Sequence, residues 1–168
     1  MSDTRDNNDI NPVTRLLGSL PSFFLKFLGA SLVLYLIYLK AGFIYMRLIA
    51  WGAGPLLAIF GRELVMENAL KVTEEISLNP VVYISLVFAV SGIPWKEKIR
   101  PAILGVIILS VANILTVFLV FMSYYMKSET LWTSTEFFNL TINFFLPILL
   151  WFVLMPVGGL FTPRRPQA

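Results

Sequence analysis

The sequence predicts an all-α, multi-pass membrane protein with about four transmembrane helices. Of its 168 residues, 57% are hydrophobic and only 14% are charged, whereas about a quarter of the residues of a soluble domain carry a charge. The apolar residues also fall in runs that are too long for the core of one soluble domain of this length to bury. Lipid is therefore the expected solvent for most of the chain, and the lipid bilayer is its first expected partner.

Four apolar runs are the predicted spans, at about residues 22–39, 81–94, 101–126 and 137–157. A helix needs about 20 apolar residues to cross a hydrocarbon core of about 30 Å. The second run is short for this and relies on local thinning of the bilayer. The spans form a single transmembrane domain over residues 21–161, with polar tails at residues 1–20 and 162–168.

Residues 42–60 are apolar but contain Arg47 and the breaker group Gly52-Ala53-Gly54-Pro55. This run could form a further span, continue the first helix, or lie along the membrane surface. An arginine inside lipid costs about 3 kcal/mol, and the three residues before the run would have to make a tight turn. We therefore favour the surface position, as an interfacial helix.

Apolar and charged side chains alternate over residues 62–76. The apolar residues of one parity are Leu64, Met66, Leu70, Val72 and Ile76, and the charged residues of the other are Glu63, Glu67, Lys71 and Glu75. Such alternation is typical of a strand and favours a short β-hairpin that turns at Glu67-Asn68. A helix stays open as the alternative, because Val65, Ala69, Val72 and Ile76 share one helical face. Residues 42–79 are thus expected to form a small extracytoplasmic subdomain.

The distribution of lysine and arginine predicts the orientation, because basic residues favour the cytoplasmic side. With four spans, eight bases lie on one side: Arg5, Arg15, Lys26, Lys96, Lys98, Arg100, Arg164 and Arg165. Five lie on the other: Lys40, Arg47, Arg62, Lys71 and Lys127. We expect a protein of the inner (plasma) membrane with both termini in the cytoplasm.

The sequence contains neither cysteine nor histidine. Disulfides, zinc sites with Cys or His ligands, haem ligation by those residues, thiol nucleophiles and Ser-His-Asp triads are therefore excluded within this chain. The net charge of +3 comes from bases beside apolar runs, which orientation in a membrane explains better than nucleic-acid binding. We expect a chain that is not an enzyme and has no catalytic residue, no cofactor, no metal site and no nucleic-acid partner.

Three amides fall inside predicted spans, with Asn113 near the middle of the third and Asn139 and Asn143 one turn apart in the fourth. A buried amide in lipid must find a hydrogen-bond partner. We expect hydrogen bonds between helices, and the lining of a small polar cavity is the alternative. Pro147 cannot donate to the carbonyl of Asn143 and predicts a kink there.

Small residues line one face of the third predicted span, at Gly105, Ala112 and Thr116. Small side chains let membrane helices approach one another closely. This stripe predicts a helix-packing surface.

Three short passages resemble the exosortase/archaeosortase group of membrane proteins. They are Ile76-Ser-Leu-Asn-Pro-Val-Val-Tyr83, Ile93-Pro-Trp-Lys-Glu-Lys-Ile-Arg100 and Ala112-Asn-Ile-Leu-Thr-Val117. The resemblance is closer to the small exosortase-associated membrane proteins than to the transpeptidases. Exosortases are similar to sortases in relying on Cys, Arg and His, but this chain has no Cys or His and has Thr116 where the group's Asn-x-x-Arg pattern places the arginine. The resemblance therefore implies an accessory member that inherits no catalytic role.

Three functions follow, in order of preference. The first is a non-catalytic accessory protein of an exosortase-type protein-sorting system. The second is a structural or assembly subunit of another membrane complex, which contacts other membrane proteins through its helix faces. The third is a small-solute transporter, which internal repeats with broken helices would favour.

Overall fold

The computed structural model describes residues 12–155, and the side chains from residue 20 onward. It contains five α-helices: α1 (Pro12–Ile59), α2 (Met66–Ile76), α3 (Asn79–Ala89), α4 (Trp95–Met126) and α5 (Glu129–Leu154). The described residues contain no strand, so the all-α prediction is confirmed for this part of the chain. Residues 1–11 of the predicted N-terminal tail, and the whole predicted C-terminal tail, lie outside the described residues.

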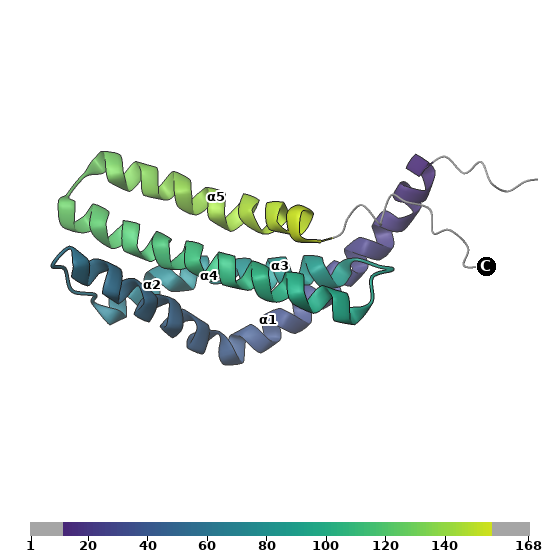
Figure 1. Cartoon of the computed structure of the whole chain (residues 1–168), viewed down its shortest axis with the longest axis horizontal. Coiled ribbons are helices and arrows are strands. Elements are labelled where there is room, and N and C mark those ends of the chain that lie inside the picture. The colour runs from purple at the N-terminus through teal and green to yellow at the C-terminus, as the bar shows by residue number, and fades with distance from the viewer. Residues whose placement is uncertain (1–11, 156–168) are drawn as a thin grey trace, which may run out of the picture.

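The helices are arranged along one long axis, as Figure 1 shows. α4 and α5 form an antiparallel hairpin, α3 packs on both of them, and α1 packs on α2, α3 and α4. Only Ser77 and Leu78 separate α2 from α3. α1 changes direction part-way along its length, so its first half diverges from the α4–α5 hairpin (Figure 1).

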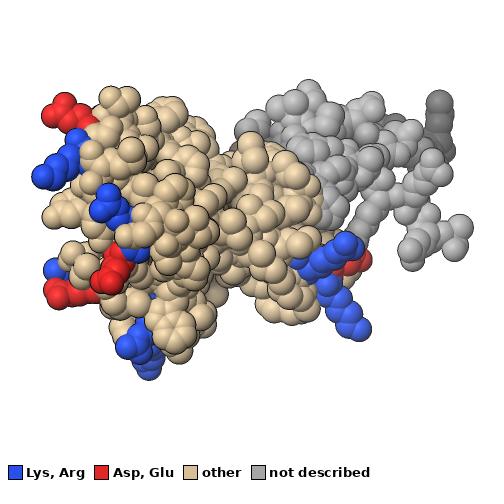
Figure 2. Space-filling view, turned by 60° about the vertical axis from the view of Figure 1, so that its left-hand side comes forward, with Lys and Arg blue, Asp and Glu red and all other residues tan. Residues whose placement is uncertain are grey.

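Four segments of the described chain are long and apolar enough to cross a membrane: Leu20–Ile59, Met66–Ala89, Trp95–Met126 and Glu129–Leu154. On the face that Figure 2 shows, charged side chains gather toward two ends of the molecule and a broad uncharged band lies between them. An uncharged band of this kind suits the hydrocarbon core of a bilayer. The chain is therefore a multi-pass membrane protein.

Residues 42–59 continue α1 as one helix, and the structure does not support the interfacial position predicted for residues 42–60. Arg47 does not interrupt the helix, because its side chain is exposed and its guanidinium lies 5.1 Å from the centre of the Phe43 ring. The opposite face is apolar and buried at Ile49, Ala50, Ala53 and Leu57. This stripe follows the helical period and gives the second half of α1 a packing surface.

The β-hairpin predicted for residues 62–76 is wrong, because Met66–Ile76 is the helix α2. Ala69, Thr73 and Ile76 are buried, at helical spacings of four and three residues. On the exposed side, Lys71 and Glu67 form an ion pair of 3.0 Å one turn apart. Burial against α1 and α4 selects the helical period over the strand period, and no separate extracytoplasmic subdomain is formed by the described residues 42–79.

Two apolar clusters fill the interior. The first joins α1, α2 and α4 and buries Ile49, Ala50, Ala53, Leu57, Ala69, Ile76, Val117 and Phe121. The second joins α3, α4 and α5, continues into the segment that follows α3, and buries Tyr83, Val87, Val90, Leu109, Leu150 and Met155. Along α4, the two clusters are separated by the turn that contains Asn113.

The turn between α3 and α4 is fixed by side chains from the start of α4, which contact the end of α3 and the residue after it. Lys98 is buried and donates to the backbone carbonyls of Phe88, at 3.2 Å, and Val90, where a positive charge also suits the C-terminal end of a helix dipole. The Trp95 ring stacks on Phe88 with 4.5 Å between ring centres. Gly92 has φ of +83°, a conformation that glycine adopts without steric cost.

α3 packs tightly against α4 at Gly105. A Cβ atom at this position would overlap the ring of Tyr83, which is fully buried. The Tyr83 hydroxyl donates to the carbonyl of Pro101 at 2.7 Å. The absence of a side chain at Gly105 therefore lets the Tyr83 ring lie against α4 and join the two helices.

We expect Gly105→Ala to lower the free energy of unfolding by about 1–3 kcal/mol, because overpacking forces the Tyr83 ring out of its position. Gly29→Ala is the matched control, since nothing lies within 4 Å of a Cβ there and alanine is the better helix former. The measurement is thermal unfolding of the purified protein in mild detergent. Equal melting temperatures for the two variants would contradict the packing described at Gly105.

Candidate functional site

The polar centre of the molecule lies where α2 gives way to α3. Pro80 has no N–H group, so the carbonyl of Ile76, four residues earlier, lacks its helical donor. Asn113 of α4 donates to that carbonyl from its Nδ2 atom at 3.5 Å. The hydroxyl of Ser77, directly after α2, is hydrogen-bonded to the hydroxyl of Tyr38 from α1. The break between the helices is thus stabilised by side chains of two other helices.

Asn79 and Asn113 form a reciprocal pair of hydrogen bonds between α3 and α4. Nδ2 of Asn79 donates to Oδ1 of Asn113 at 2.9 Å, and Nδ2 of Asn113 donates to Oδ1 of Asn79 at 3.1 Å. The two residues are 3% and 0% exposed. An amide buried this completely destabilises the fold unless it is hydrogen-bonded, so each of these two amides depends on the other.

The network continues into α5. Nδ2 of Asn79 also donates to Oδ1 of Asn143 at 3.2 Å, and Nδ2 of Asn143 donates to Oδ1 of Asn139 at 2.7 Å. Pro147 is fully buried one turn further along α5 and leaves the carbonyl of Asn143 without a helical donor. Polar groups of α5 therefore gather at the same level as the break between α2 and α3.

The network reaches α1 through Tyr45. Its hydroxyl accepts from Nδ2 of Asn113 at 2.9 Å and from the hydroxyl of Ser110 at 3.4 Å. We refer to the side chains of Tyr45, Asn79, Asn113, Asn139 and Asn143 as the amide cluster. It connects α1, α3, α4 and α5, and it lies between the two apolar clusters.

The amide groups at the centre of this cluster are hydrogen-bonded to protein atoms. The NH₂ group of Asn79 donates to two oxygens, and that of Asn113 donates to three acceptors, two of which are side-chain oxygens. The Oδ1 atom of each accepts at least one bond. A ligand site presents polar groups that are free to bind the ligand. The hydrogen-bonded amides of Asn79 and Asn113 are therefore better suited to joining helices than to binding a ligand.

The polar and small residues predicted for the spans fall into two groups in the structure. Asn113 and Asn143 hydrogen-bond to other helices, and Asn139 bonds to Asn143 within α5. The small residues Gly105, Ala112 and Thr116 lie on the buried face of α4. The Thr116 hydroxyl donates to the carbonyl of Ala112 at 3.0 Å, within its own helix. These three residues pack helices and take no part in the amide cluster.

Sequence reasoning missed Asn79, Tyr45 and Ser110. Asn79 precedes Pro80 at the start of α3, and an Asn-Pro pair between two apolar stretches is a local signal of a break that must be stabilised by other groups. Tyr45 and Ser110 have no comparable signal, because a hydroxyl in an apolar helix has many ways to be satisfied. Among the described residues, no group of three or more His, Cys, Asp or Glu is placed to hold a metal ion.

Comparison with protein-family models, curated proteins and solved structures finds no match to this chain. We therefore infer the function from the geometry of the chain itself. That geometry places paired amides at the centre and large exposed apolar surfaces around them.

We expect Asn79→Ala and Asn113→Ala each to lower the free energy of unfolding by about 1–2 kcal/mol, because each removes the donor to the buried Oδ1 atom of the other amide. The double variant should lose less than the sum, with a coupling of about 1 kcal/mol. Asn68→Ala, at an exposed amide on α2, is the control and should be neutral. Unfolding in mixed micelles compares these four variants with the wild type, and strictly additive losses would show that the two amides do not interact.

Proposed function

We propose that the chain is a non-catalytic integral membrane protein that acts as an accessory subunit and holds partner membrane proteins on its outer helix faces. The amide cluster carries this proposal. The polar side chains at the centre of the bundle are hydrogen-bonded to one another across four helices. These side chains hold the helices together. Partners would therefore bind to the outer surfaces of the bundle.

The exposed face of α1 around Arg47 has the features of a contact site for another membrane protein. Arg47 lies on α1 among the exposed residues Phe43, Ile44, Leu48 and Trp51, which together line a shallow hollow of about 270 Å³. An arginine on an apolar helix face is costly in lipid and is stabilised by a polar group that a neighbouring helix supplies. We therefore place the partner on this face of α1.

A small-solute transporter is the competing function. Helices that are broken near the middle of the membrane often form transport sites, and the break at Ser77 and Leu78 is of that kind. The carbonyl that this break frees is, however, hydrogen-bonded by Asn113, and the adjacent Asn79 is paired within the bundle. Few free groups are left there to bind a solute, and the accessory function is better supported.

The proposed setting is an exosortase-type protein-sorting system, and the resemblance of three short passages is its basis. The first and third of these passages contact each other in the fold. Asn79, in the first, pairs with Asn113, in the third, and Tyr83 of the first bonds to the carbonyl of Pro101, which directly follows the second. If the chain serves another membrane complex, the same outer faces would still provide the docking surface.

For the orientation, we propose an inner-membrane protein with both termini in the cytoplasm. The sequence contains no cysteine, so a single cysteine can be introduced at each end of the bundle without removing others. Lys96→Cys, in the first turn of α4, should react with a membrane-impermeant maleimide only after the cells are opened. Glu129→Cys, after the α4–α5 turn, should react in intact spheroplasts. The reverse pattern would contradict the orientation.

The accessory function is tested by purifying the tagged protein from its native membrane in mild detergent and identifying stoichiometric companions by mass spectrometry. We expect a membrane protein to copurify with the wild type and to be lost with Arg47→Gln. Arg62→Gln is the matched control, because Arg62 also lies 5.1 Å from an aromatic ring, that of Tyr125, at the charged end. An exosortase among the companions would support the proposed setting, and the absence of any stoichiometric companion would contradict the accessory function.

A further inference from the structure

Two basic side chains, Lys40 and Arg47, share one exposed face of α1. They are seven residues apart, and residues at this spacing lie above one another on a helix. Ile44 lies between them and Trp51 follows one turn after Arg47, and both of these side chains are exposed. We refer to Lys40, Ile44, Arg47 and Trp51 as the basic stripe, whose members follow one another at spacings of four, three and four residues.

The basic stripe lies at the depth of the middle of the bundle. This half of α1 packs on α4, and the hydroxyl of Tyr45 accepts a hydrogen bond from Asn113. Asn113 is 13 residues from Arg100 and 14 from Lys127, the bases at the two ends of the uncharged stretch of α4, so about 20 Å of helix separates it from each. Arg47 follows Tyr45 by two residues. The stripe, about 16 Å long, therefore lies within the uncharged stretch.

In the described chain, neither base of the stripe forms an ion pair, since the salt bridge present there joins Lys71 to Glu67. The guanidinium of Arg47 lies over the ring of Phe43, one turn earlier in α1. Its side chain therefore does not extend toward the charged end of the bundle at Arg62. An aromatic ring offsets only part of the cost of a charge in lipid. The basic stripe thus presents two positive charges that need partners from outside the chain.

We propose that the basic stripe binds one transmembrane helix of a partner protein, and that this helix carries two carboxylates seven residues apart. At this spacing both carboxylates lie on one face of the partner helix, so they meet Lys40 and Arg47 along a single helix–helix contact. Apolar side chains of the partner then pack on Ile44 and in the hollow of about 270 Å³ beside Arg47. The inference rests on the proposed function, because it specifies the partner of the Arg47 face.

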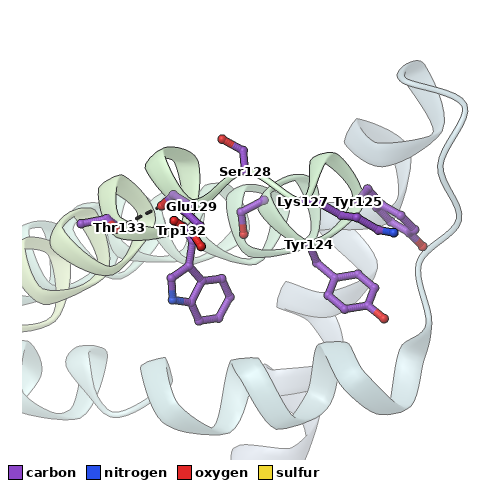
Figure 3. Close-up of a pocket in the computed structure, with 8 residues that line it drawn as sticks. Tyr124, Tyr125, Lys127, Ser128, Glu129, Trp132 and Thr133 are labelled. Atoms are coloured by element: carbon purple, nitrogen blue, oxygen red, sulfur yellow. Dashed lines mark hydrogen bonds between the residues drawn. The ribbon is translucent and has the colours of Figure 1, made fainter.

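Lipid and a second copy of the chain fit the basic stripe less well. The anionic groups of a lipid lie at the membrane surface, whereas the stripe lies at the depth of Asn113. The described chain has acidic pairs at a spacing of seven, Glu67 with Glu74 and Glu129 with Glu136, but each begins at the end of the bundle where α4 turns into α5. Figure 3 shows Glu129 at this turn. Two copies in the same orientation would not bring both carboxylates of a pair to the two bases.

The test uses synthetic transmembrane peptides, so that the natural partner is not required. Each peptide is an apolar helix of leucine and alanine with either two glutamates or two glutamines, seven residues apart, near its centre. Energy transfer between labelled chain and labelled peptide measures association in phosphatidylcholine vesicles at pH 8. The glutamate peptide should associate at a mole fraction about tenfold lower than the glutamine peptide. Equal association of the two peptides would overturn the proposal.

A third peptide tests the spacing. It carries its two glutamates nine residues apart, which places them on opposite faces of the helix. This peptide should lose most of the preference, because only one carboxylate at a time can face the stripe. Association as strong as that of the first glutamate peptide would show general charge attraction, and the proposal would fail.

Charge variants locate the contact. Lys40→Gln and Arg47→Gln should each weaken association with the glutamate peptide severalfold and leave that of the glutamine peptide unchanged. Arg62→Gln is the control, because it removes a base that lies beyond the end of α1. The double variant Lys40→Glu with Arg47→Glu should instead prefer a peptide with two lysines, and thermal unfolding should match the wild type because both positions are exposed. A double variant that is folded and still prefers the glutamate peptide would contradict the proposal.

Failure of this inference is distinguishable from failure of the proposed function. If a native companion is lost with Arg47→Gln but the peptides show no preference, the accessory function stands and the acidic partner helix is refuted. If the glutamate peptide is preferred but no native companion is found, the specificity of the stripe stands and the accessory function fails. Self-association of the chain that is lost with Arg47→Gln would assign this face to a second copy and overturn the proposal.

Discussion

The two hydrogen bonds that Asn79 and Asn113 exchange determine how the other helices lie. Each amide is buried and would destabilise the bundle if it were alone, so α3 and α4 have to meet at the level where both bonds form. Asn143 then has to approach from α5 and Tyr45 from α1, because these groups complete the hydrogen bonding of the central pair. One polar contact thereby sets the relative positions of four helices whose other contacts are largely apolar and could slide.

Two prolines explain why polar side chains are needed at this level. A membrane interior contains little water to satisfy a free carbonyl, and Pro80 and Pro147 free the carbonyls of Ile76 and Asn143. The amide cluster surrounds both positions and supplies Asn113 as the donor to Ile76. In the apolar cluster of α3, α4 and α5, the missing side chain of Gly105 lets the Tyr83 ring pack against α4. The same bundle is thus joined by amides at one level and by close packing at another.

The long apolar runs predicted the helical membrane fold, because hydropathy depends on composition alone. Burial explains the errors at residues 42–76. The strand-like alternation around Lys71 was outweighed by a helical stripe at Ala69, Thr73 and Ile76, and exposure of Arg47 allowed α1 to continue. For the site, Asn113 and Asn143 were identifiable as amides in apolar spans. Their partners were not, because a contact between residues 34 or 64 positions apart leaves no local pattern in the sequence.

Solid-state NMR of the protein in bilayers, with only asparagine labelled by ¹³C and ¹⁵N, tests the amide cluster most directly. The structure predicts side-chain cross-peaks between Asn79 and Asn113 and between Asn79 and Asn143. It also predicts that the amide protons of Asn79 and Asn113 exchange with solvent far more slowly than those of the exposed Asn68. Absence of the cross-peaks, together with exchange as fast as that of Asn68, would contradict a bundle held together by paired amides.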